Sequence, residues 1–82
     1  MNTSELRAER IRQGKNVKYM AKVIGKSEDA YAKKERGVVK FDPNEMVALQ
    51  NDLHLSPALF NAIFFDSKLL FSKFPHFASP EL

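Results

Sequence analysis

The chain has 82 residues and a mass of 9.4 kDa, which leaves room for one small domain. It has no cysteine, which excludes disulfides, thiolate zinc sites and a cysteine nucleophile and fits a reducing, cytoplasmic location. Its longest uninterrupted apolar run, residues 62–65, is far shorter than the ~20 residues that cross a bilayer. The polar N-terminus lacks the apolar stretch of a signal peptide, so we expect a soluble protein without a membrane partner.

The charge is unevenly distributed along the chain. Residues 1–40 hold eleven Lys and Arg against five Asp and Glu, a net +6, whereas residues 41–82 hold two against five, a net −3, in agreement with the overall +3. A basic half suits a polyanion such as nucleic acid. Small soluble domains also carry solvated Lys and Arg for solubility alone. Charge by itself therefore leaves both interpretations open.

Start and stop signals predict two short helices before residue 26. The first spans roughly residues 4–13 and ends before Gly14, a residue typical of helix C-termini. The second begins after Asn16 and ends at Gly25. The candidate N-caps of the first helix are Thr3 and Ser4, and the apolar positions of the second, at i, i+3, i+4 and i+7, are Val17, Met20, Ala21 and Ile24.

A third helix is predicted over residues 27–36. Ser27 is its N-cap, Glu28 and Asp29 occupy the positive end of its dipole, and Gly37 ends it. The turn at residues 25–27 is short, and its glycine permits the left-handed conformation that a tight connection needs. Two helices joined by a short glycine turn occur in many helical proteins. In the DNA-binding versions, the second helix of the pair enters the major groove.

Two further helices are predicted between residues 42 and 65. Asp42 caps the fourth, with Pro43 at its first position and Glu45 placed to complete a capping box. Ser56 and Pro57 repeat the same signal for the fifth. The expected inward residues are Met46, Leu49 and Leu53 in the fourth helix and Leu59, Phe60, Ile63 and Phe64 in the fifth. Five short helices with short turns predict an all-α domain over residues 1–65.

Residues 66–82 form an aromatic-rich C-terminal extension. They are too apolar for a typical disordered tail. The apolar stripe permits the fifth helix to continue to Pro75, and the alternative is an irregular strap that packs on the domain. The extension also suits an interface, because aromatic residues are enriched at interface cores. The candidate interface residues are Phe60, Phe64, Leu70, Phe71, Phe74 and Phe77.

The stretch from Leu6 to Phe65 resembles the Cro/C1-type (XRE) helix-turn-helix family of phage and mobile-element regulators. The residues that carry the resemblance are Leu6, Arg10, Gly14, Met20-Ala21, Gly25, Ser27, Tyr31, Lys34-Glu35, Gly37, Phe41, Glu45, Leu49, Leu55-Ser56, Leu59-Phe60 and Phe64-Phe65. The resemblance implies a five-helix, lambda-repressor-like helix-turn-helix domain. It also implies a partly buried, structural ion pair between Arg10 and Glu35.

The contact surface that the resemblance implies departs from the family pattern. The second helix begins with Val17 where the family commonly has Gln, and Glu28 and Asp29 stand where basic or amide side chains are common. A carboxylate there caps the helix dipole or accepts a hydrogen bond from cytosine N4. The candidate DNA contacts are Asn16, Lys18, Lys22, Lys26, Ser27, Glu28, Ala32, Lys33, Arg36 and Lys40, and a solvated basic face is the equally weighted alternative.

No catalytic or metal-binding pattern is present in the sequence. The two histidines, His54 and His76, have no nearby Cys, His or paired carboxylates to complete a metal site. The serines lie in capping or tail contexts, and the three glycines all lie in predicted turns. We therefore expect a protein that is not an enzyme and needs no metal or cofactor.

Two hypotheses for function follow. The first is a sequence-specific transcriptional regulator of the phage Cro/repressor type, whose recognition helix, residues 27–36, reads double-stranded DNA. A homodimer on a palindromic site is one role for the aromatic C-terminal residues, and completing the core of a small domain is the other. The alternative is an antirepressor-like protein that keeps the fold but forms a heterocomplex with a partner phage repressor. Val17, Glu28 and Asp29 motivate this second hypothesis, because they weaken a DNA surface and suit a protein surface.

Overall fold

A computed structural model describes residues 1–65 of the chain, and these residues form five helices without a strand. The prediction of an all-α fold is thus confirmed for this part of the chain. None of these helices has the length and apolar character needed to span a membrane. The helices are α1 (Thr3–Arg12), α2 (Val17–Ile24), α3 (Glu28–Glu35), α4 (Pro43–Leu53) and α5 (Pro57–Phe64).

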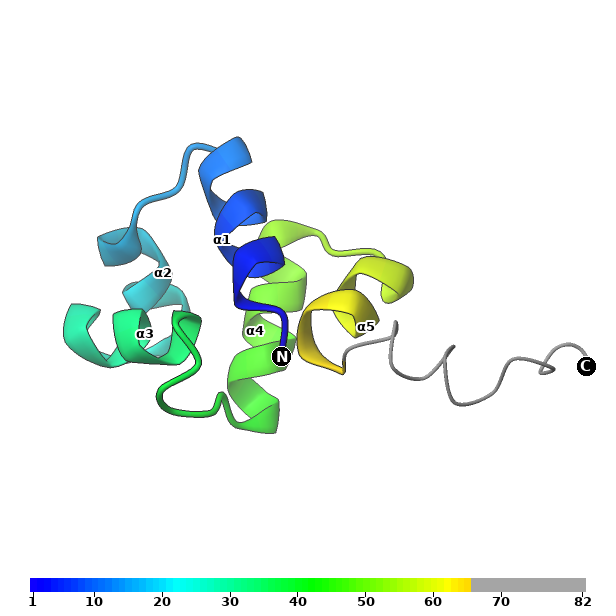
Figure 1. The fold of residues 1–82 in the computed structure, drawn as a ribbon. Helices are drawn as coiled ribbons and strands as arrows, with labels where there is room; N and C mark the ends of the chain where they lie inside the picture. Colours follow the sequence, from blue (N-terminus) through cyan, green and yellow to red (C-terminus); the bar gives the residue numbers. More distant parts are fainter. Residues whose placement is uncertain (66–82) are drawn as a thin grey trace, which may run out of the picture.

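The helices are arranged around α1 and α4 (Figure 1). The α2–α3 pair lies on one side of them, with α2 packed on both α3 and α4. Helix α5 lies on the other side, against α1. This arrangement leaves α2 and α3 at one end of the domain, where both have a face toward solvent.

The core is one cluster to which every helix contributes. Helices α2, α4 and α5 turn two or three buried apolar residues inward at helical spacing, whereas α1 and α3 contribute only Leu6 and Tyr31. Burying each large apolar side chain stabilises the fold by about 1.5–3 kcal/mol. Met46, Leu59 and Phe60 are only partly buried at the edge of this cluster. The buried apolar residues are Leu6, Met20, Ala21, Ile24, Tyr31, Phe41, Leu49, Leu53, Leu55, Ile63 and Phe64.

Each helix begins with a side-chain cap. Asn16, Ser27, Asp42 and Ser56 cap α2 to α5 as predicted, and Glu45 completes the capping box of α4. The prediction for α1 was wrong by one residue: the cap is Asn2, whose Oδ1 accepts the Glu5 N–H at 3.0 Å. Asparagine is as good an N-cap as serine and better than threonine. It lies one residue earlier, so Thr3 and Ser4 are inside the helix.

A tight turn joins α2 to α3. Gly25 has φ 70° and ψ 32°, a left-handed conformation that costs little without a Cβ. The Lys26 N–H donates to the Ala21 carbonyl at 2.9 Å, and the Gly25 N–H donates to Lys22 at 3.1 Å. These bonds satisfy the last carbonyls of α2, and Ser27 starts α3 at once. Because the turn is this short, it restricts the direction that α3 takes relative to α2.

The fifth helix ends at Phe64, and Phe65 has left the helical conformation at φ −121°. The prediction that this helix continues to Pro75, and the alternative of a strap, concern residues 66–82 and lie outside the described residues. At the other end of the fold, the Asn2 N–H donates to the Ile63 carbonyl at 2.6 Å. The start of α1 is therefore tied to the last turn of α5.

Candidate nucleic-acid interface

Helix α3 has an inward face and an outward face. Tyr31, Lys34 and Glu35 point inward and are buried, although two of them are charged. The outward positions follow at i, i+1, i+4, i+5 and i+8 from residue 28, which places them on one side of the helix. These outward residues are Glu28, Asp29, Ala32, Lys33 and Arg36, of which all but the half-buried Ala32 are exposed.

The first inward contact of α3 is an ion pair with α1. Arg10 Nε lies 2.7 Å from Glu35 Oε2, and Arg10 Nη2 lies 3.1 Å from Glu35 Oε1, so the pair is bidentate. Tyr31 donates its hydroxyl to the same Oε2 at 2.8 Å, and Arg10 also donates to the Lys15 carbonyl at 3.0 Å. The pair implied by the resemblance is therefore present. It is shielded from water, with side-chain exposures of 11% for Arg10 and 7% for Glu35.

The pKa values of this cluster follow from its geometry. The hydrogen bond that Arg10 donates to Glu35 raises the pKa of Arg10, so the guanidinium stays charged. Burial, followed by the hydrogen bond to Glu35, raises the pKa of the Tyr31 hydroxyl well above its ordinary value. The hydroxyl thus stays a donor at physiological pH. This fixed protonation pattern allows one carboxylate to hold α1 and α3 together.

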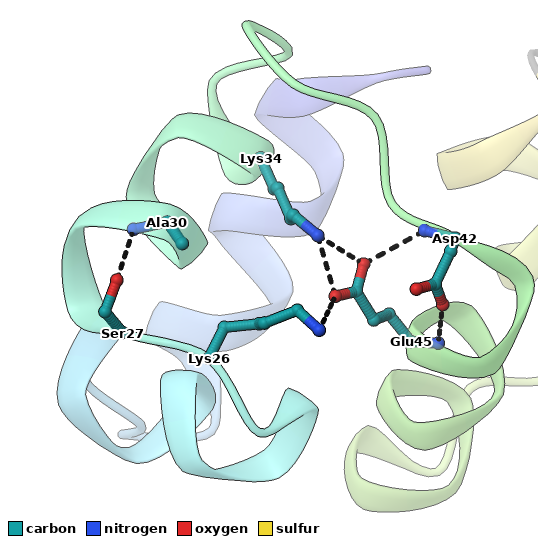
Figure 2. Close-up of polar contacts among 6 residues, drawn as sticks. All are labelled: Lys26, Ser27, Ala30, Lys34, Asp42 and Glu45. Atoms are coloured by element: carbon teal, nitrogen blue, oxygen red, sulfur yellow. Dashed lines mark hydrogen bonds and ion pairs between the residues drawn. The ribbon is translucent and has the colours of Figure 1, made fainter.

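The second inward contact of α3 is an ion pair with α4 (Figure 2). Lys34 Nζ lies 2.7 Å from both oxygens of Glu45. Lys26, in the α2–α3 turn, approaches the same carboxylate, with its Nζ 3.5 Å from Glu45 Oε2. The Asp42 N–H donates to Glu45 Oε1 at 2.9 Å. Glu45 therefore joins the turn, α3 and the start of α4.

The carboxylate of Glu45 stays ionised in spite of its burial. Burial by itself raises the pKa of Glu45, but the hydrogen bonds from Lys34 and from the Asp42 N–H, together with the charge of Lys34, bring it below the ordinary value. Only 3% of the Glu45 side chain is exposed, against 11% for Lys34 and 46% for Lys26. Of the two lysines, Lys26 is thus the one that faces solvent.

The outward face of α3 carries one ion pair of its own. Lys33 Nζ lies 3.0 Å from Asp29 Oδ2, and both side chains are largely exposed, at 47% and 77%. An exposed pair at this spacing stabilises a helix by only about 0.3–0.5 kcal/mol. Asp29 is itself exposed to solvent and not fixed by packing, so it holds Lys33 weakly, and Lys33 remains available to another anion.

The predicted contacts of α2 lie near its beginning and along its exposed side. The Asn16 side chain caps the helix by accepting the Tyr19 N–H at 2.8 Å. Lys18 and Lys22 are exposed and four residues apart, which places them on one face. Near the start of α2, Lys15 Nζ donates to Asp52 Oδ2 at 2.9 Å, and this hydrogen bond raises the pKa of Lys15. This pair ties the α1–α2 connection to α4.

Lys40 lies apart from the α2–α3 turn, beside an apolar groove. It is exposed in the loop between α3 and α4. The groove that it helps to line also receives Phe64 of α5. The residues that line this groove are Met1, Gly37, Val39, Lys40, Phe41, Met46 and Phe64.

The predicted interface residues fall into two groups. Phe60 and Phe64 are on α5 with ring centroids 4.9 Å apart, where Phe64 is buried and Phe60 is half-buried. Phe65, the next residue, is 52% exposed and its ring centroid lies 5.8 Å from that of Phe60. The remaining predicted interface residues, Leu70, Phe71, Phe74 and Phe77, lie outside the described residues.

The sequence places Glu45 in a capping box and both Glu45 and Lys34 among the residues of the resemblance, but a contact between them was not predicted. The capping box was visible because its two members are three residues apart. The Lys34 contact joins residues eleven positions apart on different helices, so no local spacing rule reveals it. The available signal was helical spacing: Lys34 lies three residues after Tyr31 and therefore on the same, inward face of α3.

Comparison with models of known protein families gives no match, and comparisons with curated proteins and with solved structures give none either. Within residues 1–65, no group of three or more His, Cys, Asp or Glu side chains is placed to hold a metal ion.

Proposed function

We propose that the chain is a sequence-specific DNA-binding transcriptional regulator of the phage Cro/repressor type, with residues 27–36 entering the major groove as the recognition helix of a helix-turn-helix. The observation that carries this proposal is the two-faced character of α3. Its inward charges are satisfied by Arg10 and Glu45, whereas Lys33 and Arg36 point outward. A helix anchored by one face and free on the other suits insertion into a groove.

The outward residues suit the two kinds of contact that such a helix makes. Lys26 and Lys33 are exposed cations at the beginning and end of α3, where they suit phosphate contacts that position the protein. Glu28 is exposed in the first turn, where it suits a hydrogen bond from cytosine N4. The resemblance to Cro/C1-type proteins, including the Arg10–Glu35 pair, supports the same assignment.

The experiment that tests this proposal is fluorescence anisotropy of the purified chain on DNA upstream of its own gene and on random duplex, across a salt series. We expect tighter binding to the upstream DNA and a log-log salt slope of several units. Lys33→Ala and Lys26→Ala should each lower the slope by about one unit. Arg7→Ala is the matched control, because it removes the same charge from an exposed position on α1. No binding at low salt contradicts the proposal.

A dimer is part of this proposal, because two recognition helices about 34 Å apart match a palindromic site. Sedimentation of the chain with and without a palindromic duplex measures this directly. We expect two chains on each duplex. One chain for each duplex at saturation contradicts the dimer and leaves DNA binding itself intact.

A second candidate function is an antirepressor-like role, in which the same surface binds a partner repressor. The observation that favours it is the acidic first turn of α3, where Glu28 is exposed and the Asp29 side chain is 77% exposed, in a domain whose α2 begins with the half-buried Val17. Glu28→Lys and Val17→Lys should each break a complex with the cognate repressor. Survival of the complex in both variants rules out this surface as the partner site.

A further inference from the structure

Glu45 makes more polar contacts than its role in the capping box requires. Its two oxygens accept Lys34 Nζ, each at 2.7 Å, and Oε1 also accepts the Asp42 N–H. With these contacts the buried carboxylate already has a full positive charge and a backbone donor as partners. The approach of Lys26 Nζ to 3.5 Å of Oε2 adds a third partner that the carboxylate does not need (Figure 2).

The charges of this cluster leave one positive charge in excess. Two ammonium groups, Lys26 and Lys34, share the Glu45 carboxylate. The neighbouring Asp42 carboxylate accepts the Glu45 N–H and forms no ion pair with either lysine. Lys34 is the closer and more buried lysine, so it neutralises Glu45, and the excess charge belongs to Lys26, whose side chain is 46% exposed. An ammonium group has three N–H donors, and contact with one carboxylate oxygen leaves others for a second anion.

The position of Lys26 places this excess charge at the beginning of α3. Lys26 follows Gly25 in the tight turn and precedes Ser27, the N-cap of α3. It therefore stands at the beginning of the helix that the proposed function inserts into the major groove. An unrestrained lysine loses much rotamer freedom when it binds a phosphate, and a lysine already held in place loses less.

We propose that Glu45 is a positioning residue for DNA binding, which holds Lys26 in advance so that its free N–H donors meet a phosphate at the beginning of α3. This inference rests on the proposed function and names the residue that prepares one of its contacts. Lys34 keeps the carboxylate neutralised, so the phosphate meets a cation and not a net negative charge. Glu45 itself, 3% exposed, touches no DNA.

A charge-matched variant tests the role of Glu45. Lys34→Met with Glu45→Gln removes one positive and one negative charge, so the net charge is unchanged, and glutamine at this position still completes a capping box. Lys26 then keeps its charge and loses its anchor. We expect DNA affinity to fall by about two- to tenfold, because the long side chain of Lys26 must then be immobilised when DNA binds. The salt slope should stay the same, because the number of neutralised phosphates is the same.

A double-mutant cycle shows whether the effect passes through Lys26. Lys26→Met alone should weaken binding and lower the salt slope by about one unit. In the Lys26→Met background, Lys34→Met with Glu45→Gln should cause no further loss, because no Lys26 charge remains to be positioned. Equal losses in both backgrounds overturn the inference and indicate a general effect on α3. If the native chain binds no DNA, the proposed function fails and the inference fails with it.

Nuclear relaxation of the lysine ammonium groups in the unmodified chain gives a readout that needs no variant and no DNA. The ¹⁵Nζ group of Lys26 should be more ordered than those of Lys18 and Lys22, which make no ion pair within residues 1–65. Equal order at the three positions overturns the inference even if the double variant does not fold.

Discussion

Two charged clusters hold α3 from the inside, and they differ in balance. In the cluster of Arg10, Glu35 and Tyr31, one cation meets one anion, and both are nearly excluded from water. In the cluster of Glu45, Lys34 and Lys26, two cations meet one anion, and one cation reaches solvent. A balanced buried ion pair therefore only fixes the packing of the two helices that it joins. A cluster with an excess charge fixes packing and also directs that charge to a particular place on the surface.

The largest effect is expected when the balanced cluster is broken. Arg10→Met leaves Glu35 buried with the Tyr31 hydroxyl as its remaining donor, and an unpaired buried charge costs about 3–5 kcal/mol. A domain of this size is stable by only about 5–15 kcal/mol, so between about a fifth and all of the free energy of unfolding should be lost. Urea denaturation followed by circular dichroism measures it. Arg7→Met, on the exposed side of the same helix, should stay within about 0.5 kcal/mol of the native chain.

A smaller effect is expected when the unbalanced cluster loses Lys34. Lys34→Met leaves Glu45 near a second cation, because Lys26 Nζ is already 3.5 Å away and its side chain is flexible. We expect a loss of about 1–3 kcal/mol in the same urea experiment, less than for Arg10→Met. Lys26→Met with Lys34→Met should lose more than the sum of the single variants, since no cation then remains beside the carboxylate. Additive losses would show that Lys26 does not compensate.

The smallest and most gradual effect concerns pH. The folded-state pKa values of Glu45 and Asp52 are both below their ordinary values. For Asp52, burial raises the pKa, but hydrogen bonds from Lys15 and Tyr19 outweigh it. Both carboxylates therefore stabilise the fold when the pH is above their ordinary pKa values of 4.5 and 3.8. That contribution is lost as the pH falls through the lower pKa values of the folded state.

Urea titrations between pH 7 and pH 3 measure this dependence. The free energy of unfolding should start to decrease near pH 4.5. Glu45→Gln removes one of the two groups and should flatten the decrease at its upper end. A curve for Glu45→Gln parallel to that of the native chain would mean that Glu45 is not the group that titrates in this range.

Much of the fold could be predicted because its signals are local. The caps Asn16, Ser27, Asp42 and Ser56 each precede a helix by one residue. Gly14, Gly25 and Gly37 mark three of the connections, and all three have positive φ. The start of α1 was misplaced because three adjacent residues, Asn2 to Ser4, are all able to cap. The Asn2 N–H is fixed by the Ile63 carbonyl, a contact that no local pattern encodes.

The candidate site was predictable only where one helix carries the information. The outward positions of α3 follow from helical phase, so the exposure of Glu28, Lys33 and Arg36 was foreseeable. The Arg10–Glu35 pair was foreseeable only through the resemblance, since it joins residues 25 positions apart. Glu45 was missed as a partner of Lys34 because three helices must pack before these side chains meet.

The hydrogen bond from the Asn2 N–H to the Ile63 carbonyl leads us to expect an order in which the domain is completed during synthesis. The chain is made from its N-terminus, so α1 leaves the ribosome first and waits for the last turn of α5. Helices α2 and α3 are linked by a short turn and find each other early, whereas this contact spans 61 positions and carries the largest loop-closure entropy. We therefore expect the contact between α1 and α5 to form last, and a nascent chain that ends before Ile63 to lack it.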